Sequence, residues 1–86
     1  MHIVLVAATR FEIAPTLQYL EHHTSPLGDG SYQMDDLQIT PLVTGAGLTA
    51  TAWHLGRFMA QHTADLAINA GIAGAFDPAF ALGDVV

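Results

Sequence analysis

The chain has 86 residues, of which 51% are hydrophobic and 12% are charged, and its formal net charge is −6. Its two basic residues exclude a nucleic-acid-binding surface, which needs clustered lysines and arginines. A chain without cysteine has neither a disulfide framework nor a thiolate site. So short a chain forms one domain at most and struggles to bury this much apolar surface. We therefore expect residues 1–86 to be the N-terminal part of a larger α/β domain that continues past Val86.

The first predicted element is a strand. Residues 3–8 form a continuous apolar run, which is typical of a strand buried on both faces of a sheet. The N-terminus has no basic region, and Arg10 interrupts the apolar run, so neither a signal peptide nor a transmembrane helix is predicted. We expect a cytoplasmic protein with no membrane partner.

A helix is predicted next, with an apolar stripe made of Ile13, Leu17 and Leu20. Thr9-Arg10-Phe11-Glu12 matches a capping box. With Thr9 as the cap, however, Pro15 would lie beyond the first turn, where proline removes a hydrogen bond and clashes with the preceding turn. We therefore predict a later helix start, near Phe11 or Glu12, with Glu12 at the strand-to-helix junction and not in a regular cap.

A β-hairpin follows the turn-rich residues 22–30. Its predicted strands are residues 32–34 and 37–43, joined around Asp35-Asp36. Proline cannot donate to a sheet's hydrogen bonds, so Pro41 favours an edge position or a bulge for the second strand.

A second helix is predicted from the glycine turn Thr44-Gly45-Ala46-Gly47 to about His62. Its predicted core stripe comprises Leu48, Ala52, Leu55 and Met59. Trp53 and His54 are interpreted as packing or subunit-contact residues on this helix, since nothing at helical spacing completes a site with them.

The last apolar run, residues 66–74, predicts a strand covered on both faces. Gly71 and Gly74 lie at its carboxyl end, where they allow backbone N–H groups to approach a ligand closely. A loop at Asp77-Pro78 and a further strand at residues 83–86 are predicted after it, with Asp84 capping a turn at the start of that strand.

Three strand ends are therefore expected at one edge of the sheet: residues 8–12, 44–47 and 71–74. The carboxyl edge of parallel strands is where open α/β sheets bind ligands, and a helix N-terminus there offers free N–H groups. Gly45 and Gly47 do not complete a dinucleotide-binding fingerprint, because Ala50 takes the place of its third glycine. A dinucleotide fold stays a minor alternative.

The order of these motifs resembles the N-terminal part of the purine nucleoside phosphorylase/hydrolase superfamily. The resemblance spans essentially all 86 residues and is carried by Glu12 after the first strand, Thr44-Gly45-Ala46-Gly47 before a helix, Asn69-Ala70-Gly71-Ile72-Ala73-Gly74, and Gly83-Asp84-Val85-Val86. It implies a three-layer α/β/α domain around a mixed sheet. Within the superfamily the chain is similar to the methylthioadenosine/S-adenosylhomocysteine nucleosidases. Arg10-Phe11-Glu12-Ile13-Ala14-Pro15 and Gly71-Ile72-Ala73-Gly74-Ala75-Phe76 most resemble the futalosine hydrolases, which release hypoxanthine from futalosine on a route to menaquinone.

The resemblance also implies roles for individual residues. Glu12 falls on the carboxylate that orients and deprotonates the attacking water. Ala8 lines the pocket floor, the glycine turn lies against the ribosyl end of the site, and the last strand end lies near base and ribose. The implied substrate-binding residues are Ala8, Gly45, Ala46, Gly47, Ile72, Ala73 and Gly74. Ile72 replaces a serine of the methylthioadenosine-type enzymes, which argues against adenine-thioether substrates.

Hydrolysis is favoured over phosphorolysis. A phosphorylase must bind a phosphate dianion, for which arginine is the usual partner, and related phosphorylases carry an arginine where this chain has Asn69. Arg57 is predicted to lie in mid-helix, away from the strand ends. Arg10 alone would give a phosphate dianion only one cationic partner. Water needs only a base such as Glu12, whose pKa burial would tune.

Two alternatives remain open: a methylthioadenosine/S-adenosylhomocysteine nucleosidase, and a non-catalytic nucleoside-binding or assembly fragment in which Glu12 is only a capping residue. The resemblance places the acid that protonates the leaving purine, and the residues that grip the ribose hydroxyls, outside residues 1–86. We expect a purine nucleoside and a second copy of the protein as partners, and no cofactor. No metal site is expected, since no carboxylate gives His22-His23 metal-ligand spacing.

Overall fold

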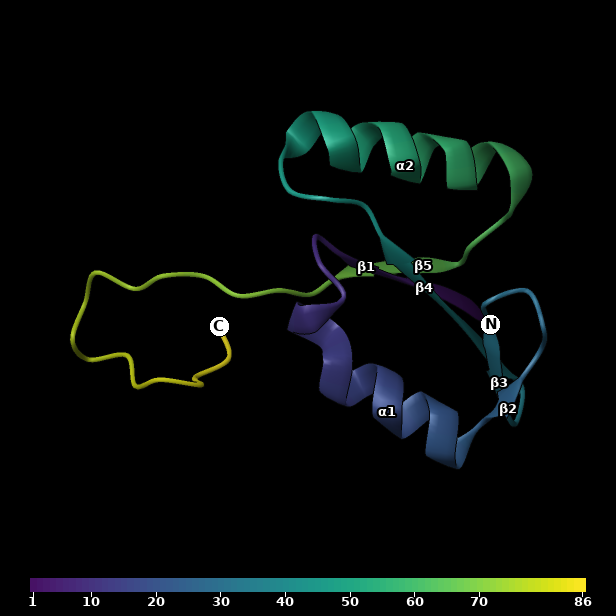
Figure 1. Cartoon of the computed structure of the whole chain (residues 1–86), viewed down its shortest axis with the longest axis horizontal. Coiled ribbons are helices and arrows are strands. Elements are labelled where there is room, and N and C mark those ends of the chain that lie inside the picture. The colour runs from purple at the N-terminus through teal and green to yellow at the C-terminus, as the bar shows by residue number, and fades with distance from the viewer.

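The computed structural model describes all 86 residues, Met1 to Val86. The chain forms a mixed five-stranded sheet and two helices, which is the expected α/β class. The elements in chain order are β1 (His2–Ala7), a 3₁₀ turn (Phe11–Ile13), α1 (Ala14–His23), β2 (Ser25–Pro26), β3 (Tyr32–Met34), β4 (Leu37–Val43), α2 (Leu48–Gln61) and β5 (Leu66–Asn69). In Figure 1, α1 and α2 lie on opposite sides of the sheet.

Strand β1 lies inside the sheet, whose order is β2-β3-β4-β1-β5. It runs parallel to β4 on one side and to β5 on the other. Its last four residues are buried, which confirms the predicted strand covered on both faces. Because side chains alternate along a strand, Val4 and Val6 point to one face while Leu5 and Ala7 point to the other.

The hydrophobic core lies between β1 and α1. Leu5, Ala7, Ile13 and Leu17 form one cluster, against which Ile39 and Ala70 pack. The predicted helix stripe is confirmed, since its three members are 2–4% exposed. Helix α1 begins at Ala14, so Pro15 lies in the first turn, where its missing N–H has no intrahelical partner to lose. The later helix start is therefore confirmed as well.

The hairpin forms as predicted, with Met34 paired to Leu37 and Asp35 at φ 54° in the turn. Strand β4 lies between β3 and β1, so the edge position predicted for the second strand is wrong for the strand as a whole and holds only locally, at Pro41. Every second residue along this stretch donates its N–H toward β1, as Gln38 does to Met1 and Thr44 does to Ala7. The backbone nitrogen of Pro41 therefore faces the opposite side, toward β3. Strand β3 pairs with β4 only as far as Ile39. Pro41 therefore costs the sheet no hydrogen bond.

The predicted core stripe of α2 is wrong, because the helix turns a different face to the sheet. Leu48 is 91% exposed and Met59 47%, and no residue of α2 is buried. The half-buried residues of this helix are instead Ala50, Thr51, Leu55 and Phe58, so only Leu55 belongs to both sets. Two contacts orient the helix: the Thr51 hydroxyl lies 3.2 Å from that of Thr44, and the Phe58 ring meets the edge of His2 with centroids 6.0 Å apart.

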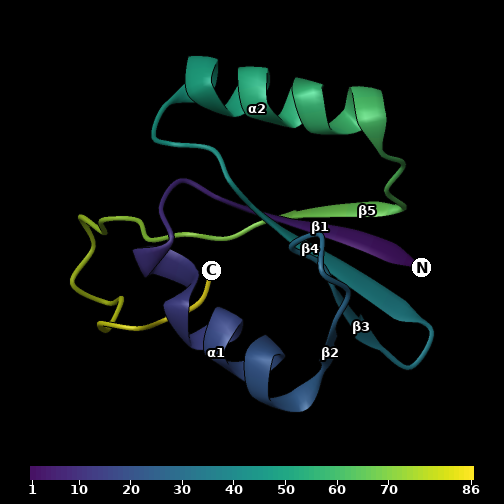
Figure 2. The ribbon, with the colours of Figure 1, turned by 45° about the vertical axis from the view of Figure 1, so that its right-hand side comes forward.

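The predicted central strand over residues 66–74 is shorter and lies elsewhere. Strand β5 ends at Asn69, forms an edge of the sheet, and has four exposed residues. It is hydrogen-bonded only to β1, and their register ends at the pair Val6–Asn69. Figure 2 shows the chain after β5 running out beyond the sheet. The predicted strand at residues 83–86 does not form. Asp84 caps a turn there by accepting the N–H of Ala81 at 2.8 Å.

Candidate functional site

The three expected strand ends meet at one edge of the sheet. The N–H of Gly45, just past β4, donates to the carbonyl of Ala8, just past β1, at 2.9 Å. On the other side of β1, the N–H of Ala70 donates to the carbonyl of Val6 at 2.9 Å. The carboxyl ends of β4, β1 and β5 are thus held side by side, as the parallel pairing requires.

Glu12 connects two of these strand ends. Its Oε2 accepts hydrogen bonds from the Thr9 backbone N–H at 2.9 Å and from the Thr9 hydroxyl at 3.0 Å. Its Oε1 accepts the backbone N–H of Ile72 at 3.3 Å, across 60 residues of sequence. Glu12 itself is half-buried in the 3₁₀ turn between β1 and α1. The carboxylate therefore lies between the end of β1 and the segment that follows β5.

The capping box Thr9-Arg10-Phe11-Glu12 does form, although Pro15 argued against it in the sequence. Besides the two bonds to Oε2, the N–H of Glu12 donates to the Thr9 hydroxyl at 3.4 Å. These reciprocal contacts cap the 3₁₀ turn and not the α-helix. Because the α-helix starts only at Ala14, the capping contacts and Pro15 coexist without a clash.

Hydrogen bonds to the charged form lower the pKa of Glu12. The Ile72 N–H contributes most, followed by the Thr9 hydroxyl and the Thr9 N–H, against a smaller opposing effect of burial. Burial was expected to tune this group, but its effect is smaller than that of the hydrogen bonds and opposite to it. At neutral pH Glu12 is a carboxylate, which can accept a proton but cannot donate one.

Gly71 is fitted closely against this carboxylate. A Cβ placed on Gly71 would lie 3.3 Å from Oε1 of Glu12 and 3.7 Å from its Cδ. A Cβ contact of 3.3 Å is tight, so a side chain there would require the carboxylate to shift by a few tenths of an ångström. The φ of Gly71 is not positive, so its backbone conformation does not require glycine. What favours glycine here is the close approach of the Glu12 carboxylate.

The other predicted substrate-binding residues have fewer contacts with the Glu12 carboxylate or none. Gly45 and Gly47 turn the chain between β4 and α2 with φ of 82° and 96°, which favours glycine. Ala46 is exposed beside them. Ala73 and Gly74 lie in the exposed segment after Ile72, and nothing lies within 4 Å of a Cβ placed on Gly74. The structure therefore brings Ala8, Gly45 and Ile72 to the Glu12 edge, whereas Ala73 and Gly74 make no hydrogen bond there.

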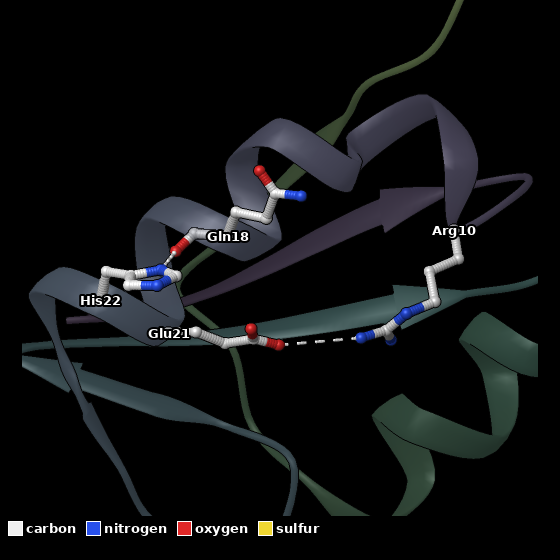
Figure 3. A network of polar contacts seen from close by, with 4 residues as sticks. All are labelled: Arg10, Gln18, Glu21 and His22. Carbon is white, nitrogen blue, oxygen red and sulfur yellow. Dashed lines mark hydrogen bonds and ion pairs between the residues drawn. The ribbon is translucent and has the colours of Figure 1, made fainter.

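Neither arginine forms an ion pair with Glu12. Arg10 Nη2 lies 3.9 Å from Glu21 Oε1, and Figure 3 shows the two side chains reaching toward each other along α1. The same view shows His22 turned to the Gln18 carbonyl, 2.7 Å from its Nδ1. Arg57 lines a shallow hollow between α2 and β4, together with His54, Phe58 and others.

Two hollows on the surface lie away from this cluster. One is lined by residues of α1 and the preceding turn, Arg10, Ala14, Leu17, Gln18 and Glu21. The other is lined by Leu42, His54, Arg57, Phe58, Gln61 and His62. Neither includes Glu12, Gly45 or Ile72. The convergent strand ends are the stronger candidate site, because hydrogen bonds orient their polar groups, whereas the two hollows are open to solvent.

Sequence reasoning missed two parts of this cluster. Thr9 was read only as a capping residue, although the spacing Thr9-x-x-Glu12 already brought its hydroxyl to the carboxylate. Gly71 was read as a position for close approach of a ligand, whereas it makes room for Glu12. No local pattern in the sequence links residues about 60 positions apart, so the sequence carries no signal for the contact between Gly71 and Glu12.

Comparison with protein-family models, curated proteins and solved structures gives no match for this chain. Its class therefore rests on the molecule itself: an α/β chain with a carboxylate between two strand ends at the carboxyl edge of its sheet. None of its helices is long and apolar enough to cross a membrane.

Proposed function

We propose that this chain is the N-terminal part of a nucleosidase that hydrolyses the N-glycosidic bond of a purine nucleoside. The observation that carries the proposal is the Glu12 carboxylate, ionised at neutral pH and oriented by Thr9 and Ile72 at the carboxyl edge of three parallel strands. The resemblance to the phosphorylase/hydrolase superfamily supplies the reaction class. A three-layer α/β/α domain is part of the same proposal.

In the proposed reaction a water molecule attacks the anomeric carbon of the ribose. The water's proton passes to Glu12 while its oxygen forms the new bond to carbon. The purine leaves with the electrons of the broken N-glycosidic bond and takes up a proton from an acid, which the resemblance places outside residues 1–86. A positioned base typically contributes on the order of a hundredfold or more in rate.

The positions of the arginines support water as the nucleophile. A phosphate dianion would require cationic partners beside Glu12, but Arg10 is paired with Glu21 and Arg57 lies on α2. Ile72 supports futalosine as the substrate, because its side chain offers no hydroxyl to a thioether nucleoside. If kcat/KM is higher for methylthioadenosine than for futalosine, the substrate assignment is wrong and the methylthioadenosine-type alternative takes its place.

One observation favours a second candidate, a non-catalytic nucleoside-binding or assembly module. Every hydrogen bond of the Glu12 side chain joins it to Thr9 or Ile72, as in a purely structural cap. Many large hydrophobic side chains are also exposed, Leu48, Trp53 and Leu82 among them, which suits assembly with a second copy.

Replacement of Glu12 separates the two candidates. Glu12→Gln keeps the size of the side chain and removes the base, so we expect turnover of the whole protein to fall by about a hundredfold or more while nucleoside binding changes little. Glu21→Gln is the matched control, because Glu21 is a half-exposed carboxylate on α1, paired only with Arg10. Equal activity of the two variants would favour the binding module.

A further inference from the structure

The two oxygens of the Glu12 carboxylate are held differently. Oε2 has two donors from one residue, the Thr9 N–H at 2.9 Å and the Thr9 hydroxyl at 3.0 Å. Oε1 has one donor, the Ile72 N–H, at 3.3 Å. The bonds to Oε2 have ordinary lengths for charged acceptors, while the bond to Oε1 is at the long end. Loss of a single donor therefore frees Oε1, whereas Oε2 keeps one donor even when the other is lost.

The two oxygens also differ in what lies around them. Oε2 is turned back to the end of β1, within the 3₁₀ turn that Thr9 and Glu12 close. Oε1 faces Gly71 and Ile72, on the segment that follows β5. The bond between Oε1 and the Ile72 N–H lies at an exposed position. Water can therefore approach this oxygen from solvent.

We propose that Thr9 is a positioning residue that fixes Oε2 of Glu12, so that Oε1 is the oxygen that takes the proton from water. This rests on the proposed nucleosidase function. When water binds, it displaces the Ile72 N–H from Oε1, and Thr9 keeps the carboxylate from rotating. The freed N–H of Ile72 is then a donor for the bound water or for the nucleoside.

Two kinds of variant at Thr9 test this role. Thr9→Val has nearly the same shape but lacks the hydroxyl, while Thr9→Ser keeps both donors. Thr16→Val is the matched control, since Thr16 is an exposed residue of α1 whose side chain makes no hydrogen bond in the structure. If Thr9→Val does not fold, Thr9→Ala removes the same hydroxyl with less steric demand in the turn.

The first readout is the pKa of the Glu12 carboxyl, followed by NMR in the whole protein and independent of activity. We expect Thr9→Val to raise this pKa toward that of an ordinary glutamate, and Thr9→Ser and Thr16→Val to leave it as in the wild type. An unchanged pKa in Thr9→Val, or in Thr9→Ala where it replaces that variant, overturns the proposal.

The second readout is purine release as a function of pH. We expect kcat to fall about tenfold in Thr9→Val with a smaller change in KM, and the acid limb of the profile to move to higher pH. A raised pKa with wild-type kcat would overturn the positioning role and leave Thr9 as a cap. A wild-type protein that releases no base overturns the proposed function itself, whatever the titration shows, so the two failures are distinguishable.

Discussion

The Glu12 carboxylate accepts the backbone N–H of Ile72 at 3.3 Å, so two segments 60 residues apart in sequence are joined at the edge of the sheet. After Ala70, whose N–H donates to the Val6 carbonyl, this is the next hydrogen bond that ties the chain to the rest of the molecule. The contact therefore orients the carboxylate and also fastens the start of the segment that leaves β5. A change at either end should be felt at the other.

Gly71→Ala tests this fit, with Gly74→Ala as its matched control. A Cβ on Gly71 would crowd Glu12 Oε1 at 3.3 Å, whereas one on Gly74 would meet nothing within 4 Å. We expect Gly71→Ala to weaken the bond to Ile72 and therefore to raise the pKa of Glu12, and Gly74→Ala to leave that pKa unchanged. NMR titration of the two variants measures the difference. The same titration curve for both would show that Gly71 and Glu12 are not in contact.

Leu17→Ala tests the core beneath α1. Leu17 is 4% exposed and packs with Leu5, Ala7 and Ile13, so its truncation should lower the free energy of unfolding by about 2–5 kcal/mol. Leu48→Ala is the control: Leu48 is 91% exposed, and we expect a change within about 0.5 kcal/mol. Urea denaturation of the two variants provides the measurement. A larger loss at Leu48 than at Leu17 would mean that the exposed face of α2 is buried in solution.

Asp29 should make stability depend on acid pH. Its carboxylate accepts the hydroxyl and the backbone N–H of buried Ser31, and these bonds lower its pKa below the ordinary 3.8. A pKa lowered on folding stabilises the protein above the unfolded value, and this contribution is lost as pH falls through the folded value. Asp29→Asn keeps an acceptor in the turn and removes only the charge.

We therefore expect Asp29→Asn to be less stable than the wild type at pH 7 and to lose less stability than the wild type on acidification below about pH 4. Glu12 contributes to stability with the same sign, so some acid dependence remains in the variant. Asp36→Asn, in the β3–β4 turn, is the control, because its side chain makes no hydrogen bond in the structure. Urea midpoints measured across pH decide the matter, and parallel curves for all three proteins would contradict the role of Asp29.

The elements near β1 could be predicted from the sequence because local patterns determine them. The apolar run of β1, the stripe of α1 and the turn at Asp35 each follow from residues that are close in sequence. The capping box was misjudged because the clash of Pro15 was considered for an α-helix starting at Thr9. A 3₁₀ turn lies between Thr9 and the start of α1, so Pro15 falls in the first turn of the α-helix and does not clash.

The remaining features depend on distant contacts. Leu55 fits two apolar stripes of α2, and the hydroxyl pair Thr44–Thr51 and the rings of His2 and Phe58 decide between them. The apolar run of residues 66–74 indicates a strand, but its pairing with β1 ends at Asn69. For the candidate site, the meeting of the strand ends was predictable from parallel topology, whereas the bond between Glu12 and Ile72 was not.

The most direct test of the central claim is purine release from futalosine by the whole protein, measured in buffer without phosphate and again with phosphate added. Hydrolysis at a site based on Glu12 predicts release of hypoxanthine and a free sugar product at the same rate in both buffers. The same assay on Glu12→Gln should show about a hundredfold less release or lower. A requirement for phosphate with a sugar phosphate as product, or full activity in Glu12→Gln, would contradict the account.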